Sequence, residues 1–113
     1  MAWNKEQVQE KIKQGAVVIN VLKEDVFKGL HIPGSINIPL GEDPEAFAGT
    51  VEQKVGKSKA IITHCSNDAC SAGPRAATIL RSKGFNAEDY PGGMKEWQEA
   101  GFPVEGTMVG AAK

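Results

Sequence analysis

One stretch of the chain, residues 60–84, constrains the fold more than any other, because a strand, a polar loop and a helix follow one another in it. It opens with the apolar, β-branched run 60–63, which is typical of a buried strand. It closes with a helical pattern in which Pro74 suits the first position, Lys83 the last turn and Gly84 the residue past the end. Strands that lead through loops into helices indicate a mainly parallel sheet.

The loop between this strand and this helix holds both cysteines of the chain, Cys65 and Cys70, together with His64. In open α/β sheets, sites form outside the carboxyl ends of the strands. A thiol in front of a helix N-terminus faces unpaired N–H groups and the positive end of the helix dipole, so its pKa commonly falls from ~8.5 to roughly 3.5–7.5. The small residues of the loop favour a curled backbone whose N–H groups cradle an anion. The alternative is that both cysteines are small buried fillers.

The length of 113 residues predicts a single domain, which we place at residues 1–105, with a flexible tail at 106–113. The formal net charge is -1, and Arg75 and Arg81 are the only arginines, so no polybasic nucleic-acid surface is indicated. The sequence shows neither an apolar run long enough for a membrane span nor an N-terminal signal region. A cytoplasmic protein is expected, and in that compartment a pair of cysteines is more often catalytic or redox-active than structural.

Strands and helices are predicted to alternate along the rest of the chain. Asn4 and Gln7 have the spacing of a capping box, and Val8 and Ile12 mark the inner face of the first helix. The predicted helices cover residues 4–14, 23–29, 41–56, 74–84 and 94–100, and the predicted strands cover 16–22, 35–38, 60–63 and 86–90. This order argues for a mainly parallel sheet with helices on both faces.

Two further polar residues, Asn20 and His31, have more than one interpretation. Asn20 interrupts an apolar strand near its carboxyl end, where it either satisfies neighbouring backbone groups or points into a site. His31 could act as a ligand or a base. We favour a ring that ties its own turn together by hydrogen bonds, because no second metal-type ligand is near it in the sequence.

Three segments together resemble the rhodanese-like sulfurtransferase family: HIPGSINIP at 31–39, the cysteine loop and its helix at 63–85, and PGGMKEWQEAGFPV at 91–104. The resemblance runs from about Asn4 to Val104, nearly the whole chain, and is to a single-domain member of the family. It implies a sheet of about five mainly parallel strands with helices on both faces. It also implies a catalytic cysteine at the end of the central strand, which corresponds to Cys65.

The chain departs from the usual family pattern in several places. A second cysteine five positions after the first, Cys70, resembles a known variant, and Cys70 falls within the loop rather than at the strand end. Where the family has an Asp-x-Arg pattern after its first strand, this chain has Asn20-Val21-Leu22, and Leu30 replaces a usual glycine. The loop also lacks the usual internal arginine, and Arg75 is the only arginine close to it.

The resemblance implies a sulfurtransferase that moves sulfane sulfur from a donor such as thiosulfate to cyanide, a thiol or a protein. Cys65 would carry the sulfur as a persulfide, without a cofactor or metal, and Arg75 would either steer the anionic donor or be a solvated helix residue. Cys70 could resolve the persulfide, form a redox disulfide with Cys65, or simply pack. The expected anion-binding loop consists of Ser66, Asn67, Asp68, Ala69, Cys70 and Ser71.

Three other functions compete with this interpretation. A cysteine phosphatase or arsenate reductase of the C-x₅-R type is disfavoured, because no arginine follows either cysteine at that spacing. A non-catalytic sulfur carrier or interaction module is favoured somewhat by the missing charged residues at positions 20 and 22. A zinc site of His64, Cys65 and Cys70 lacks an evident fourth ligand, unless the distant His31 supplies it.

Overall fold

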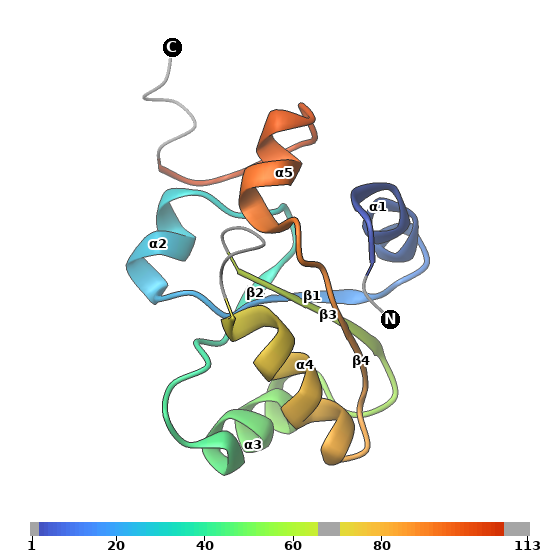
Figure 1. Cartoon of the computed structure of the whole chain (residues 1–113), viewed down its shortest axis with the longest axis vertical. Helices are drawn as coiled ribbons and strands as arrows, with labels where there is room; N and C mark the ends of the chain where they lie inside the picture. The colour runs from blue at the N-terminus through green and yellow to red at the C-terminus, as the bar shows by residue number, and fades with distance from the viewer. Residues whose placement is uncertain (1–2, 66–70, 108–113) are drawn as a thin grey trace.

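Parallel strands form the centre of the structure, a computed structural model that describes residues 3–65 and 71–107 (Figure 1). In these residues the sheet has four strands in the order β2-β1-β3-β4, and every neighbouring pair is parallel. The strands are β1 (Val17–Asn20), β2 (Ile36–Asn37), β3 (Ala60–His64) and β4 (Asn86–Asp89). The helices are α1 (Lys5–Lys13), α2 (Glu24–Gly29), α3 (Pro44–Lys54), α4 (Ala72–Ser82) and α5 (Gly93–Glu99).

The α/β class with helices on both sides of a parallel sheet is confirmed. Helices α3 and α4 lie on one side of the sheet, and α1 and α5 lie on the other (Figure 1). The described residues hold four strands, where the family resemblance implied about five. In the described residues downstream of α5, the only further β-pairing is an isolated antiparallel bridge between Glu105 and His31. A single bridge does not make a fifth strand.

The ends of the helices follow from local chemistry, with small shifts from the predicted bounds. Asn4 accepts from the Gln7 N–H at 2.8 Å and Gln7 accepts from the Asn4 N–H at 2.9 Å, which confirms the predicted capping box. Helix α4 begins at Ala72, two residues before the predicted first position at Pro74. A proline is tolerated there, because the N–H groups of a first turn have no helical partner in any case. Gly84 follows α4 with a φ of 91°, as predicted for the residue past the end.

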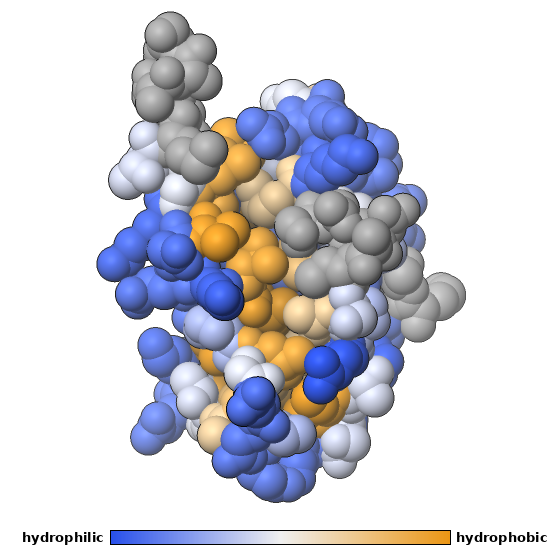
Figure 2. Space-filling model, turned by 60° about the vertical axis from the view of Figure 1, so that its left-hand side comes forward, coloured by the Kyte–Doolittle hydropathy of each residue, from blue (hydrophilic) through white to orange (hydrophobic). Residues whose placement is uncertain are grey.

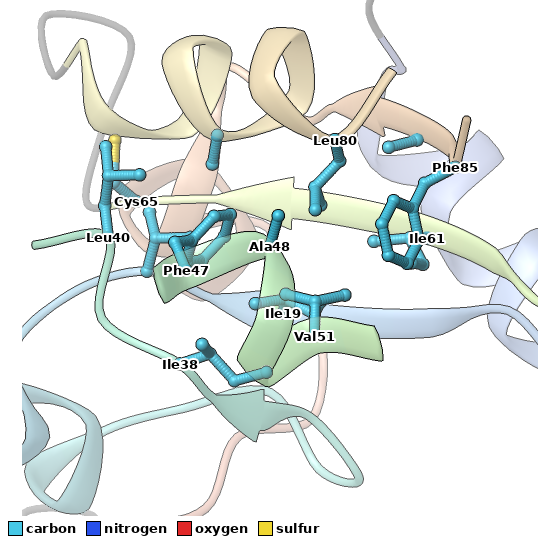
Figure 3. Close-up of a cluster of buried hydrophobic side chains, with 13 residues drawn as sticks. Ile19, Ile38, Leu40, Phe47, Ala48, Val51, Ile61, Cys65, Leu80 and Phe85 are labelled. Carbon is cyan, nitrogen blue, oxygen red and sulfur yellow. The ribbon is translucent and has the colours of Figure 1, made fainter. Parts of the chain in front are cut away.

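Strand alternation divides the apolar core into two clusters, one on each face of the sheet. Ile19 and Ile61 point to the face of α3 and α4, and Val18 and Ile62 point to the face of α1 and α5. Figure 3 shows the cluster on the α3/α4 face, with Phe47 of α3 packed beneath β3. On the α1/α5 face the core includes Val8, Ile32, Tyr90, Met94 and Trp97. Burying a side chain of this size contributes roughly 1.5–3 kcal/mol.

No helix within residues 3–65 and 71–107 has the length and apolar character needed to cross a membrane.

Candidate active site

Each strand of the sheet ends in a polar residue, and the parallel order brings these residues to one edge. Asn20 lies opposite His64 and also opposite Asn37, and Thr63 lies opposite Asp89. Asn37 donates its side-chain amide to two carbonyl oxygens at the end of β1 and just beyond it, those of Asn20 at 3.1 Å and Leu22 at 2.9 Å. The carboxyl edge is therefore polar, whereas the sheet behind it is apolar, as expected of a site in an open α/β sheet.

Cys65 follows the last residue of β3, at the carboxyl edge of the sheet. Its residue is only 3% exposed, and it belongs with Leu40 and Phe47 to the cluster on the α3/α4 face (Figure 3). Its sulfur is disulfide-bonded in this structure. The chain's other cysteine, Cys70, lies outside the described residues. Cys65 therefore lies at the end of the strand, as the sequence predicted, and its side chain is buried.

The carbonyl oxygen of Cys65 is held by two donors from different elements. The ring of His64 approaches it through Nδ1 at 3.0 Å. The backbone N–H of Met94, in the first turn of α5, donates to the same oxygen at 3.1 Å. The backbone at Cys65 is therefore fixed from the α1/α5 side of the sheet.

A compact polar group lies between the carboxyl edge and the start of α4. The Thr63 hydroxyl donates to the Gly73 carbonyl at 2.8 Å and lies 3.4 Å from an Asp89 carboxyl oxygen. The contact with α4 is so close that a Cβ on Gly73 would lie 2.4 Å from Asp89 Oδ1 and 3.4 Å from the Cys65 nitrogen. Burial raises the pKa of Asp89 to about 6, against the lowering effects of Thr63, the Tyr90 backbone and Arg81.

The opposite face carries a second polar pair, Asn20 and His64, both fully buried. Burial lowers the pKa of His64 to about 4, and the hydrogen bond to the Cys65 backbone opposes this shift. Asn20 Oδ1 accepts from the Leu22 N–H at 2.9 Å, which confirms the interpretation in which Asn20 satisfies neighbouring backbone. Asn20 Nδ2 and His64 Nε2 are both buried, and neither has a hydrogen-bond partner among the residues that the structure describes. An unpaired buried group of this kind costs roughly 1–3 kcal/mol.

The predicted anion-binding loop falls mostly outside the described residues. Ser66, Asn67, Asp68, Ala69 and Cys70 all lie there, so their roles stay predictions. Ser71 is described as the N-cap of α4 and is exposed, with no side-chain capping bond. Arg75 is exposed in the first turn of α4. Its role in steering a donor also stays a prediction.

His31 adopts the structural role that the sequence favoured. Its Nδ1 lies 2.8 Å from the Phe27 carbonyl, and its ring stacks on the Phe27 ring with a centroid distance of 4.1 Å. Its Nε2 lies 3.4 Å from a Glu105 carboxyl oxygen. Within residues 3–65 and 71–107, no cluster of three His, Cys, Asp or Glu side chains could hold a metal ion.

A surface cavity of about 220 Å³ lies between the segment that follows β2 and helix α3. Leu40 and Phe47 line this cavity and also belong to the cluster that contains Cys65. Figure 2 shows a band of apolar residues along one face of the molecule, bordered by hydrophilic side chains.

Sequence reasoning did not single out Thr63 and Asp89 as parts of the site. A usable signal was present, because Asp89 is a polar residue at the end of a strand, as Asn20 and His64 are. What the sequence could not supply was the register that places Asp89 beside Thr63 and against Gly73.

The family model described as "Rhodanese-like domain" matches residues 4–100 of this chain. A thiosulfate:glutathione sulfurtransferase of Saccharomyces cerevisiae is 31% identical over 94 residues, which cover 75% of this chain and 66% of that protein. An HTH-type transcriptional regulator of Mycobacterium tuberculosis is 33% identical over 94 residues, which cover 82% of this chain and 39% of the regulator. The chain therefore spans less than two thirds of the length of both relatives.

Solved structures share the same architecture. The crystal structure of a Bacillus halodurans protein matches with a TM-score of 0.82 and 29% identity, over 95% of this chain and 77% of that one. The rhodanese-like domain of an Anabaena protein matches with a TM-score of 0.78 and 22% identity, over 95% of this chain and 80% of the other. The second likeness concerns the fold alone.

Proposed function

Because the chain belongs to the rhodanese-like domain family, we propose that it is a sulfurtransferase that carries sulfane sulfur as a persulfide on Cys65. The observation that carries this proposal is the position of Cys65, directly after β3 at the polar carboxyl edge and against the first turn of α4. The similarity to a yeast thiosulfate:glutathione sulfurtransferase supports thiosulfate as a donor and a thiol as an acceptor.

The proposed reaction has two half-reactions. The Cys65 thiolate attacks the outer sulfur of thiosulfate, the sulfur–sulfur bond of the donor breaks, and sulfite leaves with the bonding electron pair. The acceptor then attacks the outer sulfur of the Cys65 persulfide and restores the thiolate. Cyanide becomes thiocyanate in this step, and a thiol becomes a persulfide. Covalent transfer of this kind predicts ping-pong kinetics.

The loop and the start of α4 would stabilise the charged sulfur. Backbone N–H groups of residues 66–71 would donate to the thiolate and to the persulfide anion, which is the usual means of stabilising a developing negative charge. Arg75, exposed in the first turn of α4, would attract an anionic donor. Neither task needs a metal or an organic cofactor.

A thiol–disulfide role is the second candidate, and the disulfide bond at Cys65 favours it. Under this proposal Cys65 and Cys70 form a redox pair, and reduction would be needed before Cys65 can accept sulfur. Counting thiols before and after a mild oxidant tests the pair. Loss of two thiols per wild-type molecule, together with no loss of a thiol in monomeric Cys70→Ser, would support the redox pair.

Intact-mass spectrometry tests the sulfurtransferase directly. The protein is reduced, freed of reductant, treated with thiosulfate and weighed beside Cys65→Ser and Cys70→Ser. We expect the wild type and Cys70→Ser to gain the mass of one sulfur atom, and Cys65→Ser to gain none.

An undiminished adduct on Cys65→Ser would contradict the role of Cys65. The absence of any adduct on the reduced wild type would contradict the proposed activity and favour a non-catalytic interaction module. Circular dichroism of the three proteins ensures that only folded samples are compared.

A further inference from the structure

The backbone carbonyl of Cys65 is the meeting point of two elements that are distant in the chain. His64 Nδ1 lies 3.0 Å from this oxygen, and the Met94 N–H at the start of α5 donates to it at 3.1 Å. A carbonyl oxygen has two lone pairs, so two donors fill its capacity. Because the peptide unit is planar, holding this oxygen also fixes the plane of the bond that leaves Cys65.

The contact with the Cys65 carbonyl determines which nitrogen of the His64 ring carries the proton. A carbonyl can only accept, so Nδ1 must carry the proton. The ring is neutral at ordinary pH, since burial lowers its pKa to about 4. Nε2 is then a bare acceptor, and it is buried without a hydrogen-bond partner among the described residues. Within residues 3–65 and 71–107, the bond to the Cys65 carbonyl is therefore the only hydrogen bond that the ring makes.

This arrangement is a poor source of stability. A neutral hydrogen bond contributes modestly to folding, and a buried acceptor without a partner costs at least as much. An apolar side chain of similar volume would fill the space without that cost. The distinctive contribution of the ring is the direction in which it holds the Cys65 backbone.

We propose that His64 is a positioning residue for Cys65, whose ring holds the Cys65 carbonyl together with the α5 N-terminus and so aims the thiol at the sulfur donor. This inference rests on the proposed sulfurtransferase function. His64 itself touches neither donor nor acceptor. It acts through the backbone, and misplacing a reacting atom by about 1 Å can cost roughly 100-fold in rate.

The neighbouring strand supports this assignment of the proton. Asn20 lies opposite His64 in the register of β1 and β3, so both side chains are on the same face of the sheet. Its Oδ1 is engaged by the Leu22 N–H, which leaves Nδ2 as a buried donor without a partner. The two unpartnered atoms on this face are thus a donor, Asn20 Nδ2, and an acceptor, His64 Nε2. Nε2 is an acceptor only when His64 carries its proton on Nδ1.

Three substitutions separate positioning from packing. The side-chain nitrogen of Asn reaches about as far as Nδ1, that of Gln about as far as Nε2, and Leu fills the space without a donor. We expect His64→Asn to keep the rate of persulfide formation at saturating thiosulfate within about threefold of the wild type, and His64→Gln and His64→Leu to lose about 10- to 100-fold. The thiosulfate concentration at half-maximal rate should stay unchanged in all three.

Two further readouts exclude a merely structural role. His64→Leu should be at least as resistant to denaturant as the wild type and yet slower, because it removes an unpaired acceptor together with the positioning bond. The pH profile of persulfide formation should be the same in His64→Asn as in the wild type, since the ring transfers no proton. A folded His64→Leu that loads sulfur as fast as the wild type would overturn the proposal, as would a His64→Asn no faster than His64→Gln.

A nuclear magnetic resonance measurement keeps this proposal separate from the sulfurtransferase itself. Long-range proton–nitrogen correlation of the wild-type ring should show a protonated Nδ1 and a bare Nε2 at pH 7. The opposite tautomer would overturn the positioning role even if sulfur transfer is observed. If the wild type carries no sulfur but shows the expected tautomer, the proposed function fails, and the carbonyl contact stands without a catalytic purpose.

Discussion

The two faces of the sheet treat their buried polar residues differently at the same carboxyl edge. On the α3/α4 face, Thr63 and Asp89 lie against the first turn of α4, and the Thr63 hydroxyl donates to the Gly73 carbonyl. On the α1/α5 face, Asn20 and His64 each keep one buried atom that has no hydrogen-bond partner in the described part of the chain. The first turn of α4 offers its Gly73 carbonyl to the Thr63 side chain, whereas the first turn of α5 donates the Met94 N–H to the Cys65 backbone and to neither Asn20 nor His64. Whether a buried polar side chain at this edge finds a hydrogen-bond partner therefore depends on which backbone groups the neighbouring helix presents to it.

The pKa values of the buried groups on the two faces are shifted in opposite directions. Burial favours the neutral form of both groups, so it raises the pKa of Asp89 to about 6 and lowers the pKa of His64 to about 4. Both groups are mainly uncharged between these two values. Above about pH 6, Asp89 becomes the charged member of the edge, on the face where Cys65 lies.

The largest expected effect is a pair of opposite pH dependences of stability. The stability contribution of His64 is present above its unfolded pKa of 6.5 and is lost as the pH falls toward about 4. The contribution of Asp89 is present below its unfolded pKa of 3.8 and is lost as the pH rises through about 6. In the wild type the two slopes should largely cancel between about pH 4 and 6.

Single substitutions should expose each slope. The stability of Asp89→Asn should rise as the pH goes from about 4 to 6, because only the His64 contribution remains, and this contribution approaches about 3 kcal/mol near pH 6.5. His64→Asn should lose stability relative to the wild type over the same range. Denaturant unfolding at several pH values measures both. Variant curves that run parallel to the wild-type curve would show that the two faces do not differ in this way.

A smaller effect is expected from adding a methyl group at the close contact on the α4 face. In Gly73→Ala the new Cβ would lie 2.4 Å from Asp89 Oδ1 and 3.3 Å from the His64 Cα, so the Asp89 carboxyl group must turn away or α4 must shift from the strand end. We expect a loss of about 1–3 kcal/mol in the free energy of unfolding. Gly49→Ala in α3 is the matched control, because its Cβ meets nothing within 4 Å.

The control should be neutral or more stable by about 0.5–1 kcal/mol, since alanine is the better helix former. Equal effects of Gly73→Ala and Gly49→Ala would contradict the tight packing of α4 on the carboxyl edge. Thermal or denaturant unfolding under one set of conditions is sufficient for this comparison.

The smallest expected effect is a change in the pKa of His64 on replacing its neighbour. Asn20→Asp removes the unpartnered donor and places a carboxyl group opposite His64, and an ionised carboxylate there favours the charged ring. We expect the pKa of His64 to rise from about 4 by one unit or more. Chemical shifts of the ring protons against pH measure this change, with Asn20→Ala as the control. An unchanged titration in Asn20→Asp would mean that the two side chains do not interact.

Much of the fold follows from local patterns in the sequence. The Asn4 capping box, the glycine that ends α4 and the buried run of β3 each depend on residues close together in the chain, and each was predicted. The placement of Cys65 at a strand end followed in the same way. His31 was also interpreted well, because its partner Phe27 is only four residues away.

The parts of the site that escaped prediction depend on distant contacts. Asp89 ends a strand with a weak pattern, and its role depends on the register with β3 and on the approach of Gly73. The second donor to the Cys65 carbonyl, the Met94 N–H, reaches it only because α5 packs over this end of β3. For Asn20 the interpretation that it satisfies neighbouring backbone is confirmed through Oδ1, whereas the unpartnered Nδ2 was not foreseen. Such outcomes are set by packing between elements, which single-residue patterns do not encode.

The most direct test is a single turnover from the loaded protein. Reduced protein is treated with thiosulfate, freed of small molecules and then mixed with cyanide, and thiocyanate is counted against protein. The account predicts one thiocyanate for each Cys65 that carried sulfur, with the protein mass returning to its starting value and no product from Cys65→Ser. Retention of the sulfur after cyanide, or an equal yield from Cys65→Ser, would contradict transfer through this residue.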